Sequence, residues 1–323
     1  MARRRVPTHR VDNLQSRMSN GPLVLAVPVY NAERYLGATL DSLNAEGDAL
    51  RWWLQDGGSN DKTLDIAQAA ARPGDSIHSA LDRGQSDAIN TAMHAMGGEI
   101  IGFINGDDIL IPGTARCVLD YFAAHPDVDL VYGSIEWINE SGSTTGRHTG
   151  RINSVSDILN IYRVWWGKRQ WVQPEVFFRR SLFEKVGGFD IGYHLAFDFD
   201  FWARCFIAGA RVAHIPQVFA KFRKHSGQKS SAAAEAAAEI RSIVRKHIAA
   251  GAPLNLWMRW CLNAQLDYDC YQRGETSDPT GARPSFTRAI LMHPHWFLSP
   301  AVRIRTQSSL AKWLGIRKPS SHK

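Results

Sequence analysis

The chain has 323 residues, of which 44% are hydrophobic, so it is long enough for one large α/β domain with an appendage or for two domains. Its four cysteines show neither CxxC spacing nor histidines at zinc-site intervals, which favours reduced thiols in a cytoplasmic protein over a disulfide scaffold or zinc site. No apolar run reaches the roughly 18 residues of a membrane span, and the basic N-terminus lacks the apolar stretch of a secretory signal.

The net charge of +7 is concentrated at the two ends of the chain. Residues 1–10 contain four arginines and no acid, and residues 281–323 contain eight lysines or arginines and no acid. Without these twelve cations, residues 11–280 carry a net charge of −5. This distribution suits an anionic membrane surface better than a nucleic-acid groove, so we expect no nucleic-acid partner.

Four short segments predict strands in the first third of the chain: Leu23–Pro28, Arg51–Gln55, Ser76–Ser79 and Ile100–Ile104. Strands and helical patterns alternate here at about 25-residue intervals, which is typical of a parallel sheet. No G-x-G-x-x-G or G-x-x-x-x-G-K-[ST] motif follows any of these strands, which argues against a dinucleotide-binding dehydrogenase and a P-loop enzyme.

Aspartates recur in the loops that follow these strands, as Asp56, Asp82 and Asp107. One aspartate before a helix is usually a cap, but ligands of such sheets bind at the carboxyl ends of the strands, where these three are expected to meet. In the loop Asn105-Gly106-Asp107-Asp108, two adjacent carboxylates suit a hard divalent cation that also binds substrate phosphates. As a bare pair they are more often turn residues, and the surrounding loops favour the cation site.

The second half of the chain is less regular. A helix is expected to about Ala124, then strands over 129–134, 176–178 and 211–215, with a hairpin or mobile loop over 139–157. The aromatic, basic segment 162–171 is either core packing or a platform on which sugars stack.

Two further residues are candidates for chemistry. Asp198 lies among aromatic residues, where desolvation raises a carboxyl pKa toward general-base values; its alternative role is to cap the helix through Ala208. His225 lies in a polar loop among lysines and arginines, a setting suited to phosphate or a metal, although a lone histidine is usually structural.

Beyond Ser231, which is expected to cap an alanine-rich helix, helical patterns over 254–271 and 286–292 predict a C-terminal appendage. In the basic tail, Leu310, Trp313 and Leu314 have helical spacing. This segment is either an interfacial membrane helix or ordinary packing against the fold.

Taken together, the motifs resemble the family 2 glycosyltransferases, which are inverting nucleotide-sugar enzymes of the GT-A fold. The matching stretches, all between residues 22 and 230, are Pro28-Val29-Tyr30-Asn31, Asp56-Gly57-Gly58-Ser59-Asn60-Asp61-Lys62-Thr63, Asp82-Arg83-Gly84-Gln85-Ser86-Asp87-Ala88-Ile89-Asn90, Asn105-Gly106-Asp107-Asp108, Gly187-Gly188-Phe189-Asp190 and Asp198-Phe199-Asp200.

The resemblance implies an α/β fold with a mixed, mostly parallel sheet flanked by helices. It implies a GT-A domain over 21–230, with a nucleotide-binding half (21–115) and an acceptor half (116–230). A basic, disordered N-terminus (1–20) would precede this domain, and a helical basic extension (231–323) would follow it.

The resemblance also assigns roles to residues. The implied nucleotide-sugar-binding residues are Pro28, Tyr30, Asp56, Arg83, Gly84, Asn105 and Gly106. Of these, Pro28 and Tyr30 would pack the base, Asp56 would accept a hydrogen bond from it, and Arg83 would lie by the ribose or diphosphate.

Chemistry is implied for four other residues. Asp107 and His225 would hold Mg²⁺ or Mn²⁺ against the diphosphate, with Asp108 as a further ligand or a support. Asp198 resembles the catalytic base that deprotonates an acceptor hydroxyl. Two positions depart from the family pattern: Asn105 replaces a frequent aspartate, and Phe197 replaces a glutamate before the base.

The expected activity is transfer of one sugar, because the Gln-x-x-Arg-Trp motif of processive synthases is absent. The resemblance implies a nucleotide-diphospho-sugar donor, a UDP-sugar in the first instance, and a glycan or lipid-linked acceptor at the cytoplasmic face of a membrane. It thus implies a part in cell-surface polysaccharide or glycolipid synthesis. The alternatives are a catalytically silent nucleotide-sugar sensor and, less favoured for want of its glycine-rich basic loop, a sugar-phosphate nucleotidyltransferase.

Overall fold

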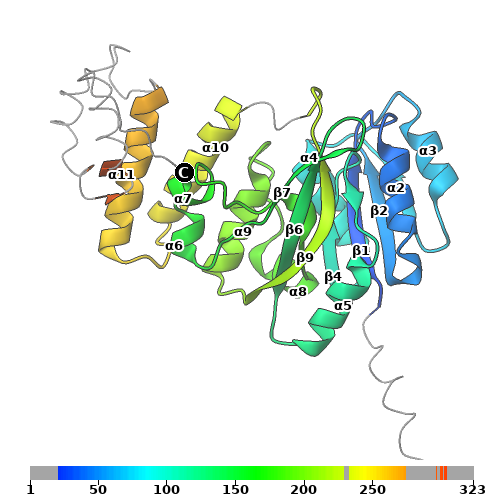
Figure 1. Ribbon diagram of the computed structural model, residues 1–323, viewed down its shortest axis with the longest axis horizontal. Helices are drawn as coiled ribbons and strands as arrows, with labels where there is room; N and C mark the ends of the chain where they lie inside the picture. The colour runs from blue at the N-terminus through cyan, green and yellow to red at the C-terminus, as the bar shows by residue number, and fades with distance from the viewer. Residues whose placement is uncertain (1–20, 229–232, 274–295, 297–298, 301, 304–323) are drawn as a thin grey trace, which may run out of the picture. The chain divides into compact units, whose positions relative to one another are not determined.

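The computed structural model describes residues 21–228, 233–273, 296, 299–300 and 302–303 (Figure 1). These residues form two compact units. The first contains the described residues before Arg151 and those from Trp171 to Gln228, and the second contains Arg151–Gln170 with the C-terminal helices. The segment Arg151–Gln170, which the sequence placed in the acceptor half, therefore groups with the C-terminal helices.

Four parallel strands form one half of the sheet in the first unit, and they confirm the strands predicted there. In the order β3-β2-β1-β4 they are Ser76–Ser79, Leu50–Asp56, Leu23–Val29 and Ile100–Phe103. All seven residues of β1 are buried, as expected of an apolar strand covered on both faces. The carboxyl ends of these strands carry the polar loops.

Antiparallel pairs and a further parallel pair complete the mixed sheet. Strand β8 (Val176–Arg179) joins β4 to β6 (Leu130–Ile138), and β9 (Val212–Arg223) runs parallel to β6. The short β5 (Ile109–Leu110) pairs with β9, and β7 (Thr144–His148) forms a hairpin with β6. Strand β9 is much longer than predicted, because it pairs with β6 along the length of that strand and past two register irregularities.

Helices cover both faces of the sheet. Helices α2 (Leu36–Asn44), α3 (Thr63–Ala70) and α5 (Thr114–Ala124) pack with alternate β1 residues in one apolar core. Helix α4 (Gln85–Ala95) leads from β3 back across β2 and β1 to β4, so a right-handed connection puts it on the opposite face.

Aromatic side chains fill the core on the α4 face. Helix α8 (Arg180–Val186) ends at Gly187, which has the left-handed conformation expected of this glycine stop. The ring of Phe178 packs against those of Phe183 in α8 and Phe201 in α9 (Phe197–Ile207), with centroids 6.5 and 5.2 Å apart. This aromatic layer fixes α9, whose first turn carries Asp198.

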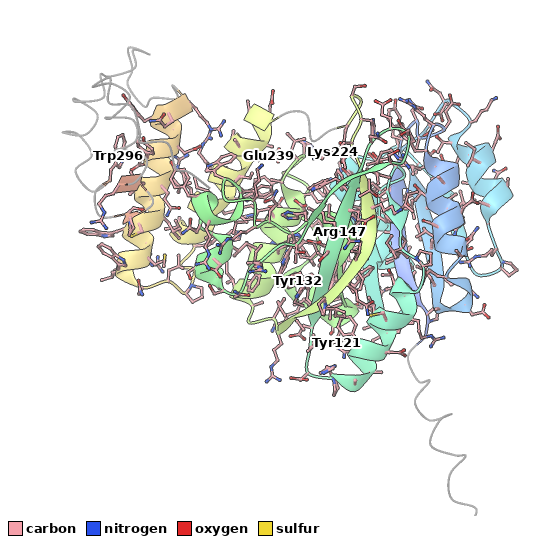
Figure 2. All side chains as sticks on the ribbon, viewed as in Figure 1. Tyr121, Tyr132, Arg147, Lys224, Glu239 and Trp296 are labelled. Carbon is pink, nitrogen blue, oxygen red and sulfur yellow. The ribbon has the colours of Figure 1, made fainter. Side chains whose placement is uncertain are left out.

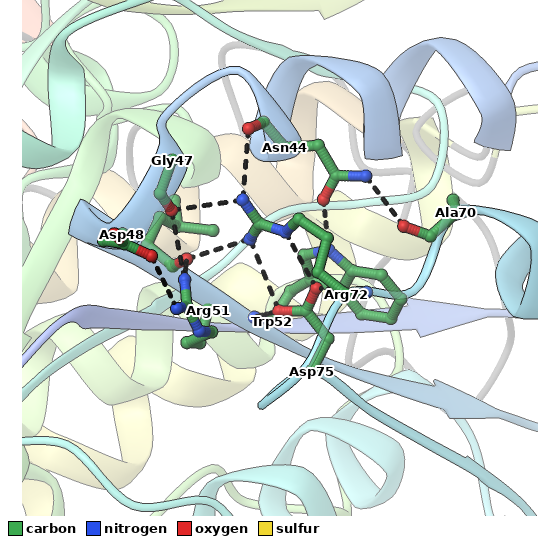
Figure 3. A network of polar contacts seen from close by, with 9 residues as sticks. Asn44, Gly47, Asp48, Arg51, Trp52, Ala70, Arg72 and Asp75 are labelled. Atoms are coloured by element: carbon green, nitrogen blue, oxygen red, sulfur yellow. Dashed lines mark hydrogen bonds and ion pairs between the residues drawn. The ribbon is translucent and has the colours of Figure 1, made fainter.

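A network of polar contacts holds the amino-terminal end of β2, away from the polar loops (Figure 3). Arg72 donates to the backbone carbonyls of Asn44, Gly47 and Leu50 and pairs with Asp75 at 3.0 Å. Its guanidinium thus holds the segment between α2 and β2, at the end of β2 opposite to Asp56.

The second unit is helical, which confirms the predicted appendage. It contains α6 (Val155–Ile158), α7 (Ile161–Val164), α10 (Ala233–Ala249) and α11 (Leu256–Arg273). A buried ion pair joins α10 to α11, with the two side-chain atoms of Arg241 and Asp269 2.9 Å apart.

Trp296, labelled in Figure 2, is 1% exposed and packs against Tyr268 and Tyr271 of α11. The predictions for residues 1–20, Ser231, 286–292 and the Leu310–Ile316 segment lie outside the described residues. Among the residues that the structure does describe, no helix is long and apolar enough to cross a membrane.

Candidate functional site

The loops that follow β1 and β2 are fastened to one another. Asn31, at φ 49°, donates its backbone N–H to Ser59 Oγ at 2.8 Å, and its side-chain oxygen accepts from the Asn60 N–H at 3.0 Å. Asparagine tolerates this left-handed conformation better than most residues do. The result is one continuous polar rim across the carboxyl ends of two neighbouring strands.

Asp56 organises the second of these loops from inside. It is fully buried, and its carboxylate accepts hydrogen bonds from Ser59 Oγ at 2.5 Å and Ser79 Oγ at 2.6 Å. The N–H groups of Gly58 and Ser59 also donate to it. The aspartate that is predicted to contact the base therefore holds in place the loop at which the base is expected to bind.

Pro28 and Tyr30 differ in their exposure to solvent. Pro28 lies in β1 and is buried, whereas Tyr30, just beyond the strand, is 65% exposed. An exposed aromatic ring at the end of a central parallel strand offers an apolar face to a planar base. The structure therefore leaves Tyr30 accessible for the stacking role that the sequence predicted.

The loop that follows β3 comes close to the loop that follows β2. A Cβ on Gly57 would lie 2.7 Å from the Asp82 carboxylate, so a larger residue there would displace that carboxylate. Gly84, at φ +118°, donates its N–H to Asp82 at 2.8 Å. Arg83 is exposed and pairs with Asp87 at 2.8 Å, and this hydrogen-bonded guanidinium lowers the pKa of Asp87. The predicted Arg83 and Gly84 thus stand beside the loop of Asp56.

The loop that follows β4 contacts the start of α4 and the end of β1. Gln85 donates to the side-chain oxygen of Asn105 at 2.7 Å, which links the start of α4 to the end of β4. A Cβ on Gly106 would lie 2.8 Å from a methyl of Val29. Glycine at this position therefore allows the loop of Asp107 to approach the end of β1.

Asp107 and His225 come together from positions 118 residues apart. His225 Nε2 and Asp107 Oδ2 lie 2.8 Å apart, and both side chains reach solvent with 15% and 22% of their surface exposed. A carboxylate oxygen and an imidazole nitrogen at one solvent-reaching point can share a divalent cation such as Mn²⁺.

Asp108 is placed differently from Asp107. It is completely buried, and its Oδ1 accepts the backbone N–H of Arg223 at 3.0 Å. Burial, reinforced by the neighbouring charge of Asp107, raises the pKa of Asp108 well above its ordinary value. Of the three predicted metal ligands, the structure pairs Asp107 with His225 and directs Asp108 into the protein.

Three or more His, Cys, Asp or Glu side chains do not gather at a metal-binding geometry anywhere in the described part of the chain. Two protein ligands nevertheless fit Mg²⁺ or Mn²⁺ when the substrate supplies phosphate oxygens, as in kinase and polymerase sites. The Asp107–His225 pair suits such a site, because it leaves the solvent side open to a diphosphate.

Asp198 lies in the first turn of α9, next to the end of β4. The adjoining Phe197 ring is 6.2 Å from that of Phe103, the last residue of β4. Helix α9 begins at Phe197 with Ala196 at its N-cap position, so the alternative cap role for Asp198 is wrong. Asp200, two residues further, is fully buried and pairs with Arg204 at 2.7 Å.

The aromatic segment is in part core. Trp171 is 3% exposed and packs against the rings of Tyr132 (labelled in Figure 2) and Trp202, with centroids 4.8 and 5.9 Å apart. For this tryptophan, the core-packing interpretation is confirmed.

Three residues that the sequence did not single out contact the strand end or loop of the site, namely Gln85, Gln173 and Arg223, and Glu175 lies buried two residues after Gln173. Gln173 donates to the backbone carbonyl of Phe103, and Glu175 accepts the N–H of Val172 at 3.0 Å. Burial raises the pKa of Glu175 well above its ordinary value. A glutamate beside apolar strand residues was the available signal, since such a side chain needs donors when it is buried.

Comparison with known proteins agrees with this geometry. Residues 24–187 match the model of the family described as "Glycosyl transferase family 2". A "PGL/p-HBAD biosynthesis glycosyltransferase" of Mycobacterium bovis is 32% identical over 210 residues, which cover 63% of this chain and 77% of the relative. A chondroitin synthase of Escherichia coli is 32% identical over 126 residues, covering 38% of this chain and 18% of the synthase.

Among solved structures, S. aureus TarS (residues 1–349 in complex with UDP-GlcNAc) is similar to this chain with a TM-score of 0.59. The sequences are 18% identical, and the match covers 85% of this chain and 78% of the other. At that identity the likeness shows the fold alone, and it confirms the expected GT-A fold.

Proposed function

Because the chain belongs to glycosyl transferase family 2 and is a glycosyltransferase, we propose that it moves one sugar from a nucleotide-diphospho-sugar to an acceptor hydroxyl, with inversion and with Mg²⁺ or Mn²⁺. The observation that carries the proposal is the Asp107–His225 pair at the carboxyl ends of the parallel strands. Carboxylates and imidazoles of this kind hold a cation against a diphosphate.

The roles of the binding residues follow from their exposure. Tyr30 stacks on the base, and the loop that Asp56 organises surrounds the base edge. Arg83 and the Gly84 N–H lie by the ribose or diphosphate, while Asn105 hydrogen-bonds a ribose hydroxyl beside Gly106. The donor we favour is a UDP-sugar, because TarS, which shares the fold, was solved with UDP-GlcNAc.

Asp198 acts as the base. It takes the proton of the acceptor hydroxyl as that oxygen forms a bond to the anomeric carbon and the bond to the diphosphate breaks. When Mg²⁺ or Mn²⁺ is bound, it would supply the positive charge that offsets the charge developing on the departing nucleotide diphosphate. Asp107 and His225 would hold that cation, and Asp108 ties the loop of Asp107 to the backbone of Arg223.

Glycolipid or polysaccharide synthesis is the proposed context, because similar chains are named for PGL/p-HBAD biosynthesis and as a chondroitin synthase. A glycan or lipid-linked acceptor fits this context. The catalytically silent sensor is the competing proposal, and turnover of the donor separates the two.

A panel of nucleotide sugars with Mn²⁺ is expected to identify the donor by thermal stabilisation. A ligand at a hundred times its Kd adds about 2.7 kcal/mol of stability, which for a domain of this size raises Tm by roughly 5 to 10 °C. The same donor should be hydrolysed slowly to free sugar and nucleotide diphosphate. Stabilisation without hydrolysis or transfer would favour the silent sensor.

The basic tail predicts salt-sensitive membrane binding. Each lysine or arginine close to an anionic leaflet contributes about 1 kcal/mol, so full-length protein should sediment with phosphatidylglycerol vesicles at low salt. Truncation after Arg303, which keeps the buried Trp296 and removes Leu310, Trp313, Leu314 and five of the eight cations, should largely abolish this co-sedimentation. Protein that stays in the supernatant at low salt would leave the tail with a packing role.

A further inference from the structure

We propose that Arg223 is a positioning residue, which holds Asp107 and His225 at the separation that a shared cation requires. The inference rests on the proposed cation site and names the residue that sets its geometry. Arg223 is only 5% exposed and is the last residue of β9. It therefore acts through its neighbours and does not contact the donor itself.

Arg223 is bonded to both aspartates of the β4–β5 loop. Its Nε donates to the backbone carbonyl of Asp107 at 2.9 Å, and its own backbone N–H donates to Asp108 Oδ1 at 3.0 Å. One residue thus fixes the main chain that carries Asp107 and the buried carboxylate next to it. Displacement of Arg223 would free this loop from β9.

The guanidinium also reaches the turn of the β6–β7 hairpin. Its Nη1 donates to the carbonyls of Asn139 and Glu140, each at 3.2 Å, and its Cζ lies 4.6 Å from the centre of the Tyr35 ring. The Tyr35 ring is in turn 5.1 Å from the ring of His225. Arg223 therefore contacts the ring that packs against the second member of the pair.

His225 follows Arg223 by two residues, in a loop that is tied at both ends. The Lys224 N–H donates to the carbonyl of Ile138 at 2.8 Å, and the Gln228 side chain donates to the carbonyl of Arg223 at 2.8 Å. The loop that carries His225 is therefore bonded to Ile138 at its start and to the carbonyl of Arg223 at its end. Asp107 and His225 take their relative position from the same residue.

Arginine has the shape that this position requires. A planar guanidinium presents donors in several fixed directions and stacks on an aromatic face, whereas a lysine ammonium is a compact charge with no such plane. Arg223→Lys keeps the charge but cannot reach the Asp107 carbonyl and the hairpin carbonyls together.

Arg72 provides a matched control at the other end of the sheet (Figure 3). It too donates to three backbone carbonyls, those of Asn44, Gly47 and Leu50, where Leu50 begins β2 and Asp56 ends it. Arg72→Lys therefore removes a comparable set of bonds without touching the loops at the carboxyl ends.

The experiment measures Mn²⁺ binding to the full-length protein by electron paramagnetic resonance, with UDP as the probe nucleotide, alongside thermal unfolding. Loss of groups that orient metal ligands costs about 10- to 100-fold in metal affinity, and we expect this loss for Arg223→Lys. Arg72→Lys should lower Tm and leave Mn²⁺ affinity unchanged.

Tyr35→Leu serves as a second variant if Arg223→Lys does not fold. It removes the ring between Arg223 and His225, so Mn²⁺ affinity should fall, whereas Tyr35→Phe keeps the ring and should bind as the wild type does. Wild-type affinity in Arg223→Lys or in Tyr35→Leu, or an equal loss in Arg72→Lys, would overturn the positioning role. Wild-type protein that binds no Mn²⁺ with UDP would overturn the cation site together with this inference.

Discussion

Asp107→Ala is expected to abolish sugar transfer and to remove the dependence of nucleotide binding on the cation. Asp107 supplies the carboxylate of the pair, and without it His225 is the sole remaining member. A bound cation stabilises the departing charge by several kcal/mol, so transfer should fall by about 10³-fold or more. Removing Mn²⁺ with a chelator should have the same effect on the wild-type protein.

Calorimetry with UDP, with and without Mn²⁺, checks this expectation. The contacts of Tyr30 and the Asp56 loop remain in the variant, so weak binding independent of cation should survive. Asp127→Ala is the control, because Asp127 is an exposed aspartate paired with Arg211 at 2.9 Å. If Asp107→Ala retains nucleotide affinity that still rises with Mn²⁺, the cation lies elsewhere.

The first half of the fold could be predicted because its signals are local. The strands from Leu23, Arg51 and Ile100 are short apolar runs, and each is followed by turn residues and a helical pattern. Such periodicity depends on neighbouring residues alone, so it survives without any knowledge of tertiary contacts.

Contacts between distant parts of the chain account for what the sequence did not predict. Strand β9 gains its length from β6, and Pro216 and Gln217 in its middle interrupt the apolar pattern on which the shorter prediction depended. The grouping of Arg151–Gln170 with the C-terminal helices likewise depends on packing between segments far apart in sequence.

At the site, too, local sequence signals could be predicted and contacts between distant residues could not. Asp107 and His225 were paired by resemblance to a family, since a separation of 118 residues has no local signature. The resemblance did not distinguish Asp108 as ligand from Asp108 as support, and the 3.0 Å bond from the Arg223 N–H is what separates its environment from that of Asp107. The role of Arg223 could not be predicted, because in the sequence it is one cation among several near His225. Its partners are main-chain carbonyls, which leave no trace in a sequence.

Asp198→Asn is expected to separate chemistry from donor binding. The amide keeps the shape of the side chain but cannot accept the acceptor proton, so transfer should fall by about 10² to 10⁴, the usual contribution of a general base. Donor affinity should be unchanged, because the residues assigned to the nucleotide lie on the strand-end loops and not on α9. Steady-state transfer rates, combined with calorimetric UDP-sugar binding, measure the two effects separately.

Asp200→Asn is the matched control on the same helix. Asp200 is fully buried and bound to Arg204 Nε at 2.7 Å, and Arg204 also donates to the carbonyl of Val186. Weakening that bond should cost about 1 to 3 kcal/mol of stability, because Arg204 loses the opposite charge of the carboxylate. The variant that remains folded should still transfer sugar at a rate close to that of the wild type. If Asp200→Asn loses transfer while Asp198→Asn keeps it, the base is Asp200, and the motif has been aligned two residues out of place.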